Sequence, residues 1–330
     1  MKLLSKLFGF IGFVNTTRTQ IPTHILEAAI EHVVDGIEPR MRYFPGYKKI
    51  LGNAVATAMT HIDRLVDSIP GPLPVSSQGF IDNPEVKAFF ASVDAIHDIF
   101  SDSEELKLFF NQVDNYDLKE VCALLCMNVT EKTMFGVGLH ENILQRDVMQ
   151  TALDFSEHKI LSPAASVEEV RHGISQCIFD GLITYALQKI LAIKHQKQEL
   201  ETQHSILVAR LRARQSQGRG LSSLIASATE TGLHSDIEQQ ISDTEQKQQQ
   251  LPASENSLQY YLDTIRHTLE HPQDFIHIEH KTCNINNMSI VTRDDSSQPS
   301  NTIHFTEISI AGVLKRAIAI VRYPRSEILT

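Results

Sequence analysis

Two long amphipathic segments with a short break between them constrain the fold of this chain more than any other feature. Residues 183–214 contain no Pro or Gly, and apolar residues recur there every three or four positions. Residues 217–220 interrupt the pattern, and a second series runs on to Leu251. Such a narrow apolar seam predicts two helices that pair as a coiled-coil-like hairpin. The seam residues are Ile183, Leu187, Ile190, Leu200, Leu207, Leu211, Leu233, Ile237, Ile241 and Leu251.

The remaining faces of this hairpin are rich in Gln, Glu, Lys and Arg, so the hairpin cannot form the core of a globule. We expect it to project from the body as an arm and to contact a partner. Lys197 and His204 occupy seam positions where Leu would be better, and such residues can set register or partner choice. Pairing within the chain and dimerisation through the arm both remain open. The predicted partner-binding residues of the seam are Leu200, Leu207, Leu211, Ile237 and Ile241.

Four arginines lie near the predicted tip of the hairpin, namely Arg210, Arg212, Arg214 and Arg219. A cationic tip can contact nucleic acid, acidic lipid or an acidic protein surface. Cations at the end of a helix also complement its dipole, which is a sufficient structural reason for them. We include these arginines among the candidate partner-binding residues.

The composition fits a globular protein with room for two compact domains, or one domain and an arm. The chain has 330 residues, 42% of them hydrophobic and 21% charged, with a net charge of −10. That charge argues against coating of nucleic acid or of anionic membranes by the whole body. Four cysteines without framework spacing are typical of a reducing compartment, so we expect a cytoplasmic protein.

The N-terminal segment, residues 1–20, is short, basic and amphipathic. Its apolar residues would share one helical face, beside Lys2 and Lys6, which suits a peripheral contact with a membrane surface. A segment docked on the core and a cleaved signal peptide are the alternatives, although no A-x-A-like site follows. The candidate membrane-contact residues are Leu3, Leu7, Phe8, Phe10 and Ile11, with Val14 on the same face.

The sequence predicts an α+β protein with an N-terminal helical bundle, a small antiparallel sheet and the helical hairpin. Helices are expected over residues 24–35, 47–69, 84–100, 103–112 and 118–127, with Asp82-Asn83-Pro84 as a helix start. Ser166 to Glu169 reads as a capped start of the long helix. The predicted regions are 1–20, 21–131, 132–165 together with 272–330, and 166–271.

The period of the pattern changes near Thr133, where short strands are expected over residues 134–139, 143–148 and 151–155. A turn at 140–142 would join the first two, although residues 142–153 could also form one helix, and Ser162-Pro163 would end the run. Alternation after Phe275 predicts strands over residues 275–280, 302–310 and 316–323. Whether the two β regions form one sheet stays open.

No phosphate-binding glycine loop, dinucleotide turn or nucleophile elbow occurs in the sequence, and we predict neither a cofactor nor a metal. The densest group of potential ligands is His267, His271, His277, His280 and Cys283. Pro272 ends the helix, and His277 and His280 would face opposite sides of a strand. Cys122 and Cys126 are interpreted as core residues.

A second basic stretch, between Arg40 and Lys49, mixes cations with aromatic residues. Such a mixture can bind phosphate and stack on bases, but we interpret the stretch as an interhelical turn at Pro45-Gly46 with inward aromatic residues and solvated cations.

The leading functional hypothesis is therefore a non-enzymatic interaction or adaptor protein that binds a partner through the helical arm. The first alternative is an enzyme with an unrecognised site in the body, near residues 267–283 or 136–147. The second is nucleic-acid binding through the arm tip or the stretch 40–49.

Overall fold

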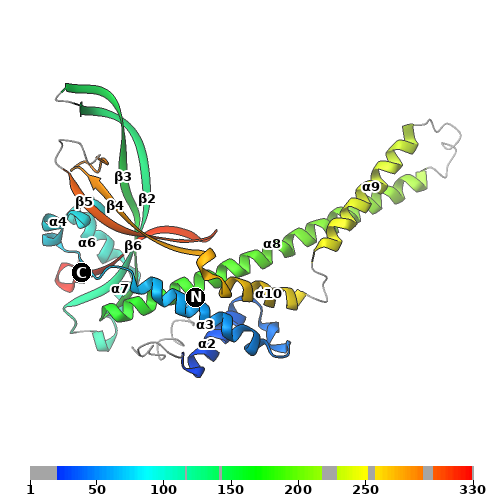
Figure 1. The fold of residues 1–330 in the computed structure, drawn as a ribbon, viewed down its shortest axis with the longest axis horizontal. Helices are drawn as coiled ribbons and strands as arrows, with labels where there is room; N and C mark the ends of the chain where they lie inside the picture. Colours follow the sequence, from blue (N-terminus) through cyan, green and yellow to red (C-terminus); the bar gives the residue numbers. More distant parts are fainter. Residues whose placement is uncertain are drawn as a thin grey trace. The chain divides into compact units, whose positions relative to one another are not determined.

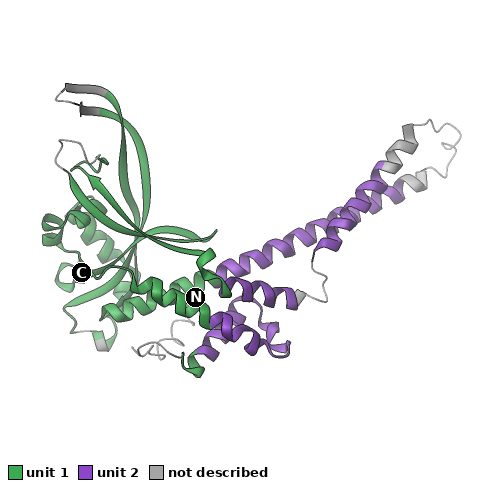
Figure 2. Ribbon diagram, in the orientation of Figure 1, with its two compact units in different colours: residues 1–25, 56–182, 270–330 green, residues 26–55, 183–269 purple. Residues whose placement is uncertain are grey.

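A computed structural model of the chain describes residues 21–115, 117–140, 143–217, 229–251, 257–292 and 300–328. At 114, 137–140, 143–146, 214–217, 229–235 and 257 it describes the backbone alone. The α+β class and the long helical hairpin are confirmed (Figure 1). The chain divides into two compact units (Figure 2). Unit 1 comprises residues 1–25, 56–182 and 270–330, and unit 2 comprises 26–55 and 183–269.

Unit 1 is built on one antiparallel sheet with the order β3-β2-β6-β5-β4. The two predicted β regions therefore belong to a single sheet. A two-residue strand, β1 (Leu73–Pro74), pairs in parallel with β6 at Val321 and Arg322. The five long strands are β2 (Glu120–His140), β3 (Ile143–Ala164), β4 (Ile276–Ile285), β5 (Asn301–Ile310) and β6 (Leu314–Pro324).

Short helices cover one face of this sheet and form its main core. Ser76, Asn83, Ser92 and Ser103 each accept a hydrogen bond from a backbone N–H of the first helical turn, which is how such side chains start helices. The four helices are α4 (Ser77–Asp82), α5 (Pro84–Phe89), α6 (Val93–Asp102) and α7 (Glu104–Phe110). Phe89, Phe100 and Leu106 are buried in one cluster with alternate residues of two strands, among them Val121 of β2 and Tyr323 of β6.

Within unit 1 the first part of the long helix α8 (Val167–Gln217) packs closely against the sheet. A Cβ atom added to Gly181 would lie 2.4 Å from Cδ1 of Ile310, so the helix approaches β5 at a residue without a side chain. The predicted start of α8 is confirmed, since the Glu169 amide donates to Ser166 Oγ at 3.3 Å. Arg171 donates to the carbonyl oxygens of Val66 and Ile69 at the end of α3 (Tyr47–Asp67).

Strand β3 carries three bulges where it pairs with β2. At each register shift, two positions along β2 correspond to three positions along β3, so β3 carries one extra residue there. Asp147, Glu157 and Ser162 lie at these three shifts, and all three have positive φ. Between the bulges, residues 128–136 pair regularly with 148–156. The pairing continues to His140 and Ile143, while residues 141 and 142 of the predicted turn lie outside the described residues.

Three local predictions are wrong. Residues 118–127 are not a helix, because β2 starts at Glu120 and is buried on both faces, with Val121, Ala123 and Leu125 on one and Leu124 on the other. A run buried on both sides has no alternation to reveal the strand. The alternative helix over 142–153 is not formed, because residues 143–153 belong to β3. Ser162-Pro163 does not end the strand, since Pro is tolerated on an edge strand and β3 is an edge.

Unit 2 contains most of α2 (Thr23–Ile37), the start of α3, the rest of α8, α9 (Thr229–Gln250) and α10 (Ser257–Glu270). Val33, Val34, Leu51 and Ala54 are buried here, and the Cβ of an added side chain at Gly36 would touch Ile183 of α8. Residues 183–217 of α8, together with the whole of α9, are called the arm below. Among the described helices none is long and apolar enough to cross a bilayer.

Candidate functional site

The arm is the element for which the sequence predicts function, and its two helices pair through a seam of alternating three- and four-residue steps. Leu200 of α8 and Ile237 of α9 are buried, and Leu207, Leu211 and Ile241 are half-buried. These five predicted partner-binding residues are thus withdrawn from solvent on the two helices of the arm, which run side by side (Figure 1). A partner that binds the closed arm must therefore use its outer faces. The described seam positions are 193, 197, 200, 204, 207 and 211 in α8, and 237, 241, 244 and 248 in α9.

Four of these ten seam positions are polar, namely Lys197, His204, Thr244 and Gln248. His204 Nε2 lies 3.1 Å from Oε1 of Glu245, which joins the two helices by a polar contact. Thr244 is buried, and its hydroxyl donates to the carbonyl of Gln240 one turn earlier. Polar seam positions weaken a coiled coil but fix the alignment of its helices.

The outer face of α8 exposes an apolar residue beside a cation. Ile206 keeps 48% of its surface exposed, and Arg210 follows it by four residues on the same face. Arg212 is also exposed but lies on the other flank of the helix. Only the backbone of Arg214 is described, and Arg219 lies outside the described residues, as do Leu3, Leu7, Phe8, Phe10 and Ile11. Sequence reasoning missed Ile206, because it followed the seam alone.

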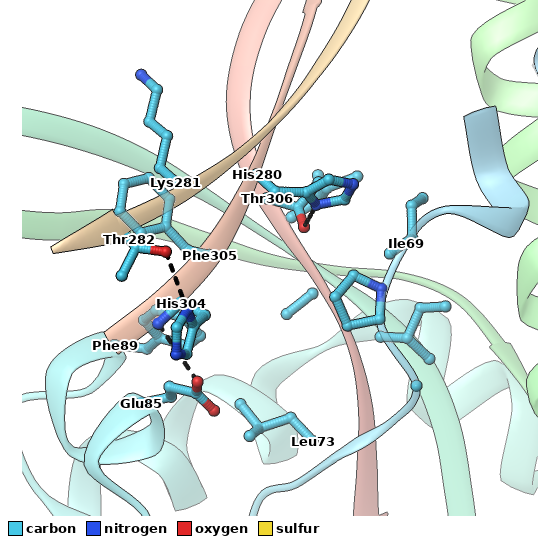
Figure 3. Close-up of a pocket in the computed structure, with 15 residues that line it drawn as sticks. Ile69, Leu73, Glu85, Phe89, His280, Lys281, Thr282, His304, Phe305 and Thr306 are labelled. Atoms are coloured by element: carbon cyan, nitrogen blue, oxygen red, sulfur yellow. Dashed lines mark hydrogen bonds between the residues drawn. The ribbon is translucent and has the colours of Figure 1, made fainter. Parts of the chain in front are cut away.

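The second candidate is a notch in the sheet of unit 1, where β5 separates from β6. Strands β5 and β6 pair only from Thr306 to Ile310, and the first half of β5 leaves a cavity of about 300 Å³ beside it. The segment 69–73 closes one side, and α5 closes the other with Glu85 and Phe89 (Figure 3). Apolar side chains of Ile318 and Ile320 also line the cavity.

Two His–Thr pairs stand at this notch. His280 Nδ1 lies 3.0 Å from Thr306 Oγ1, and Thr282 Oγ1 lies 3.0 Å from His304 Nδ1. The pairs are cross-strand neighbours, so all four side chains share one face of β4 and β5. The amide of His304 donates to Glu85 at 3.3 Å (Figure 3). Among the described residues neither imidazole contacts a carboxylate that would orient it as a general base.

Lys281 also lines the notch, but its charge is already compensated. Its Nζ donates to Glu307 at 2.9 Å, and Lys315 donates to the same carboxylate at 2.8 Å. Burial raises the pKa of Glu307, but the hydrogen bonds from the two lysines outweigh it and leave the pKa below its ordinary value of 4.5. The carboxylate is therefore charged at neutral pH, and this cluster fixes β4, β5 and β6 together.

The predicted group of potential ligands is spread over several elements. His267 is exposed in α10, His271 follows the end of that helix, and His277 is exposed on β4. His280 lines the notch, and Cys283 is half-buried on the core face of β4. In the described part of the chain no three His, Cys, Asp or Glu side chains gather so that they could hold a metal ion.

A Ser–His–Glu cluster joins α4, α6 and the end of the chain. Ser77 Oγ lies 3.1 Å from His97 Nε2 and also donates to Glu327 at 3.1 Å, while Glu327 lies 3.4 Å from the same His97 nitrogen. In a hydrolytic triad the acid binds the other ring nitrogen and leaves the hydroxyl to the base. Here the carboxylate competes with the imidazole for the hydroxyl, so the cluster fastens residue 327 to α4.

The basic stretch between Arg40 and Lys49 is largely neutralised by acids. Arg40 pairs with Glu38 at 2.8 Å, and Arg42 pairs with Glu31 at 2.9 Å. Lys48 lies 3.3 Å from Glu31 as well. The cations are thus shared with carboxylates of α2 and of the following turn, which reduces the attraction that they offer to phosphate.

The chain was also compared with known proteins. No protein-family model, no curated protein and no solved structure matches it.

Proposed function

We propose that this chain is a non-enzymatic interaction protein whose helical arm binds a protein partner. The observation that carries the proposal is the exposure of Ile206 next to Arg210 on a helix whose own seam is already closed. On a helix that already buries its seam, an exposed apolar side chain beside an arginine is available to a partner, and arginine is enriched among interface hot spots. We place this activity in the cytoplasm, which the sparse cysteines without framework spacing support.

The contact is tested in native cells with p-benzoylphenylalanine in place of Ile206 in the full chain. We expect light-dependent crosslinks to one specific protein. The matched control carries the same photoreactive residue in place of Glu201, which is exposed on the opposite flank of α8. A chain that lacks residues 189–249, closed by a short Gly-Ser link, should lose the partner. Identical proteins captured from both positions, or no capture at all, would refute the arm as the binding element.

A binding measurement on the full chain separates this proposal from nucleic-acid binding. If the arm tip binds nucleic acid, binding weakens with salt and falls when Arg210, Arg212 and Arg214 are replaced by Gln. We expect no salt-dependent binding of nucleic acid, because the proposed protein partner is held by the apolar side chain of Ile206. Membrane contact by the N-terminal segment stays a prediction of the sequence.

A further inference from the structure

The sheet of unit 1 ends in two edge strands of different kinds, β3 and β4. β3 carries three bulges, whereas β4 pairs with β5 along all of its ten residues without a register shift. No residue of β4 has a positive φ, and only its two end residues, Ile276 and Ile285, are buried. An edge of this regularity presents a row of backbone groups to which another strand can bond.

The structure shows which backbone groups of β4 point away from the sheet. Thr292, which is not part of β5, donates its amide to the carbonyl of Asn284 at 2.8 Å. Because bonded and outward groups alternate along an antiparallel strand, the amides and carbonyls of Ile278, His280 and Thr282 also point outward. Among the described residues, no group bonds to these outward amides and carbonyls. The open part of the edge is therefore the stretch 278–282.

We infer that two copies of this chain associate by antiparallel pairing of their β4 strands along this stretch. A second copy is the occupant because the stretch is complementary to itself. With a two-fold axis at His280, the outward groups of residue 280 meet each other, and those of Ile278 meet those of Thr282. This pairing makes about six backbone hydrogen bonds, two for each bonded pair of residues.

The charges of β4 select this register over its neighbours. With the axis at His280, Glu279 of one copy lies directly opposite Lys281 of the other, and the symmetry repeats this contact. Moving the axis by one residue would place either two copies of Glu279 or two copies of Lys281 opposite each other. Opposite charges stabilise a cross-strand pair, and like charges destabilise it. The same charges also discourage pairing with an unrelated strand.

Both side chains are available for this contact. The side chain of Glu279 is 65% exposed, and its carboxylate lies 3.9 Å from Lys281 of its own chain. Lys281 donates to Glu307 at 2.9 Å and keeps 35% of its side chain exposed. Since an ammonium group carries three donors, Lys281 can keep its bond to Glu307 and also bind Glu279 of the second copy.

The contact involves one short edge and is smaller than a typical stable interface, so the dimer is weak. We expect dimers at about 0.1 mM of chain and monomers at about 1 µM. A two-fold contact occupies the β4 edge of both copies, so the association ends at two chains. The contact lies within unit 1 and uses no residue of the arm, so it is independent of the proposed function.

The experiment is carbodiimide crosslinking of the full chain, in a mixture of isotopically light and heavy protein at the higher concentration. Carbodiimide joins a carboxylate to an amine that it contacts. We expect crosslinks between Glu279 and Lys281 that combine one light and one heavy peptide. The internal control is the exposed pair Lys132 and Asp154, which lie 2.8 Å apart within one chain and should give unmixed crosslinks only.

Charge reversal tests the register. Glu279→Lys should raise the dissociation constant measured by sedimentation equilibrium about tenfold, because two attractions become repulsions. Lys281→Glu should weaken the dimer as well, and a mixture of the two variants should dimerise again, since each lysine then meets a glutamate. Asp98→Lys, at an exposed position of α6, is the control and should leave the dissociation constant unchanged.

Two results would overturn the inference in a protein with unchanged circular dichroism. If the chain stays a monomer at the higher concentration and gives no mixed crosslink, the β4 edge is left to a strand of another protein. If mixed crosslinks join Glu279 to a different lysine, the copies meet in another way. Since neither result involves Ile206, the proposed function is tested separately.

Discussion

Nε2 of His204 in α8 lies 3.1 Å from Oε1 of Glu245 in α9, so a polar contact joins the two helices of the arm. Because polar seam residues favour one alignment at the expense of stability, we predict opposite effects of His204→Leu on these two properties. The variant should raise the free energy of unfolding of the arm by about 1–2 kcal/mol. It should also form dimers that the unmodified chain does not form at the same concentration.

Hydrogen exchange of the α8 and α9 amides and light scattering measure the two effects. Gln203→Leu adds an apolar residue at an exposed position next to the seam and serves as the control. Faster exchange in His204→Leu than in the unmodified chain would show that the His204–Glu245 contact stabilises the arm.

Gly79 is predicted to be intolerant of any side chain. A Cβ atom there would lie 2.4 Å from the carbonyl oxygen of Pro74, and backbone cannot yield as a side chain can. Gly79→Ala should therefore lower the free energy of unfolding by about 1–3 kcal/mol, as overpacking does. Gly71→Ala is the matched control, because nothing lies within 4 Å of its added Cβ. Urea denaturation measures both, and equal midpoints would contradict the close contact.

His158 should make the stability of the fold sensitive to mild acid. Burial lowers the pKa of His158 below its ordinary value of 6.5, and the carbonyl of Phe89, 2.7 Å from Nε2, only partly offsets this. The unfolded chain therefore binds the proton first, and stability that is complete above pH 6.5 declines as the pH falls below it. His158→Gln keeps a hydrogen-bond donor but removes the titration.

We expect the urea midpoint of His158→Gln to vary less than that of the unmodified chain between about pH 7.5 and pH 5. His61 and His172, whose pKa values burial also lowers, should keep part of the dependence. A steeper pH dependence of the urea midpoint in the variant would mean that the protonated form of His158 stabilises the fold.

Glu307→Gln is predicted to destabilise unit 1 at neutral pH by about 1–3 kcal/mol, because a buried charged acceptor of two lysines is lost. A carboxylate with a lowered pKa contributes stability above the ordinary value of 4.5, and this contribution is lost as the pH falls through the folded value. Denaturation midpoints of the variant and the unmodified chain should converge in acid. Glu279→Gln, which alters a more exposed partner of Lys281, is the control. A difference that persists in acid would assign the effect to packing.

The arm could be predicted from the sequence because its pattern is local. Leu200, Leu207 and Leu211 repeat within one helix, and a repeat of this kind needs no knowledge of distant residues. The capped starts at Asn83 and Ser166 are equally local, and both are confirmed.

The sheet and the notch depend on distant residues, which limits what the sequence reveals. Strand β1 has two residues and exists only because Leu73 meets Val321. His304 was not a candidate, since its relation to Thr282 follows from the register of β4 and β5. The run from Val121 to Met127 is apolar throughout, so its period distinguishes neither helix nor strand.

The three bulges of β3 also bear on how this protein behaves at high concentration. An uninterrupted edge strand of 22 residues would be a template for stacking identical chains into fibrils. Asp147, Glu157 and Ser162 turn the backbone out of the extended conformation at three points, and Pro163 removes a donor next to the last one. Between the bulges the longest regular stretch is 148–156, and the turn bonded to Leu153 and Thr151 occupies part of its edge. The irregular edge thus disfavours pairing of a second chain along the whole strand.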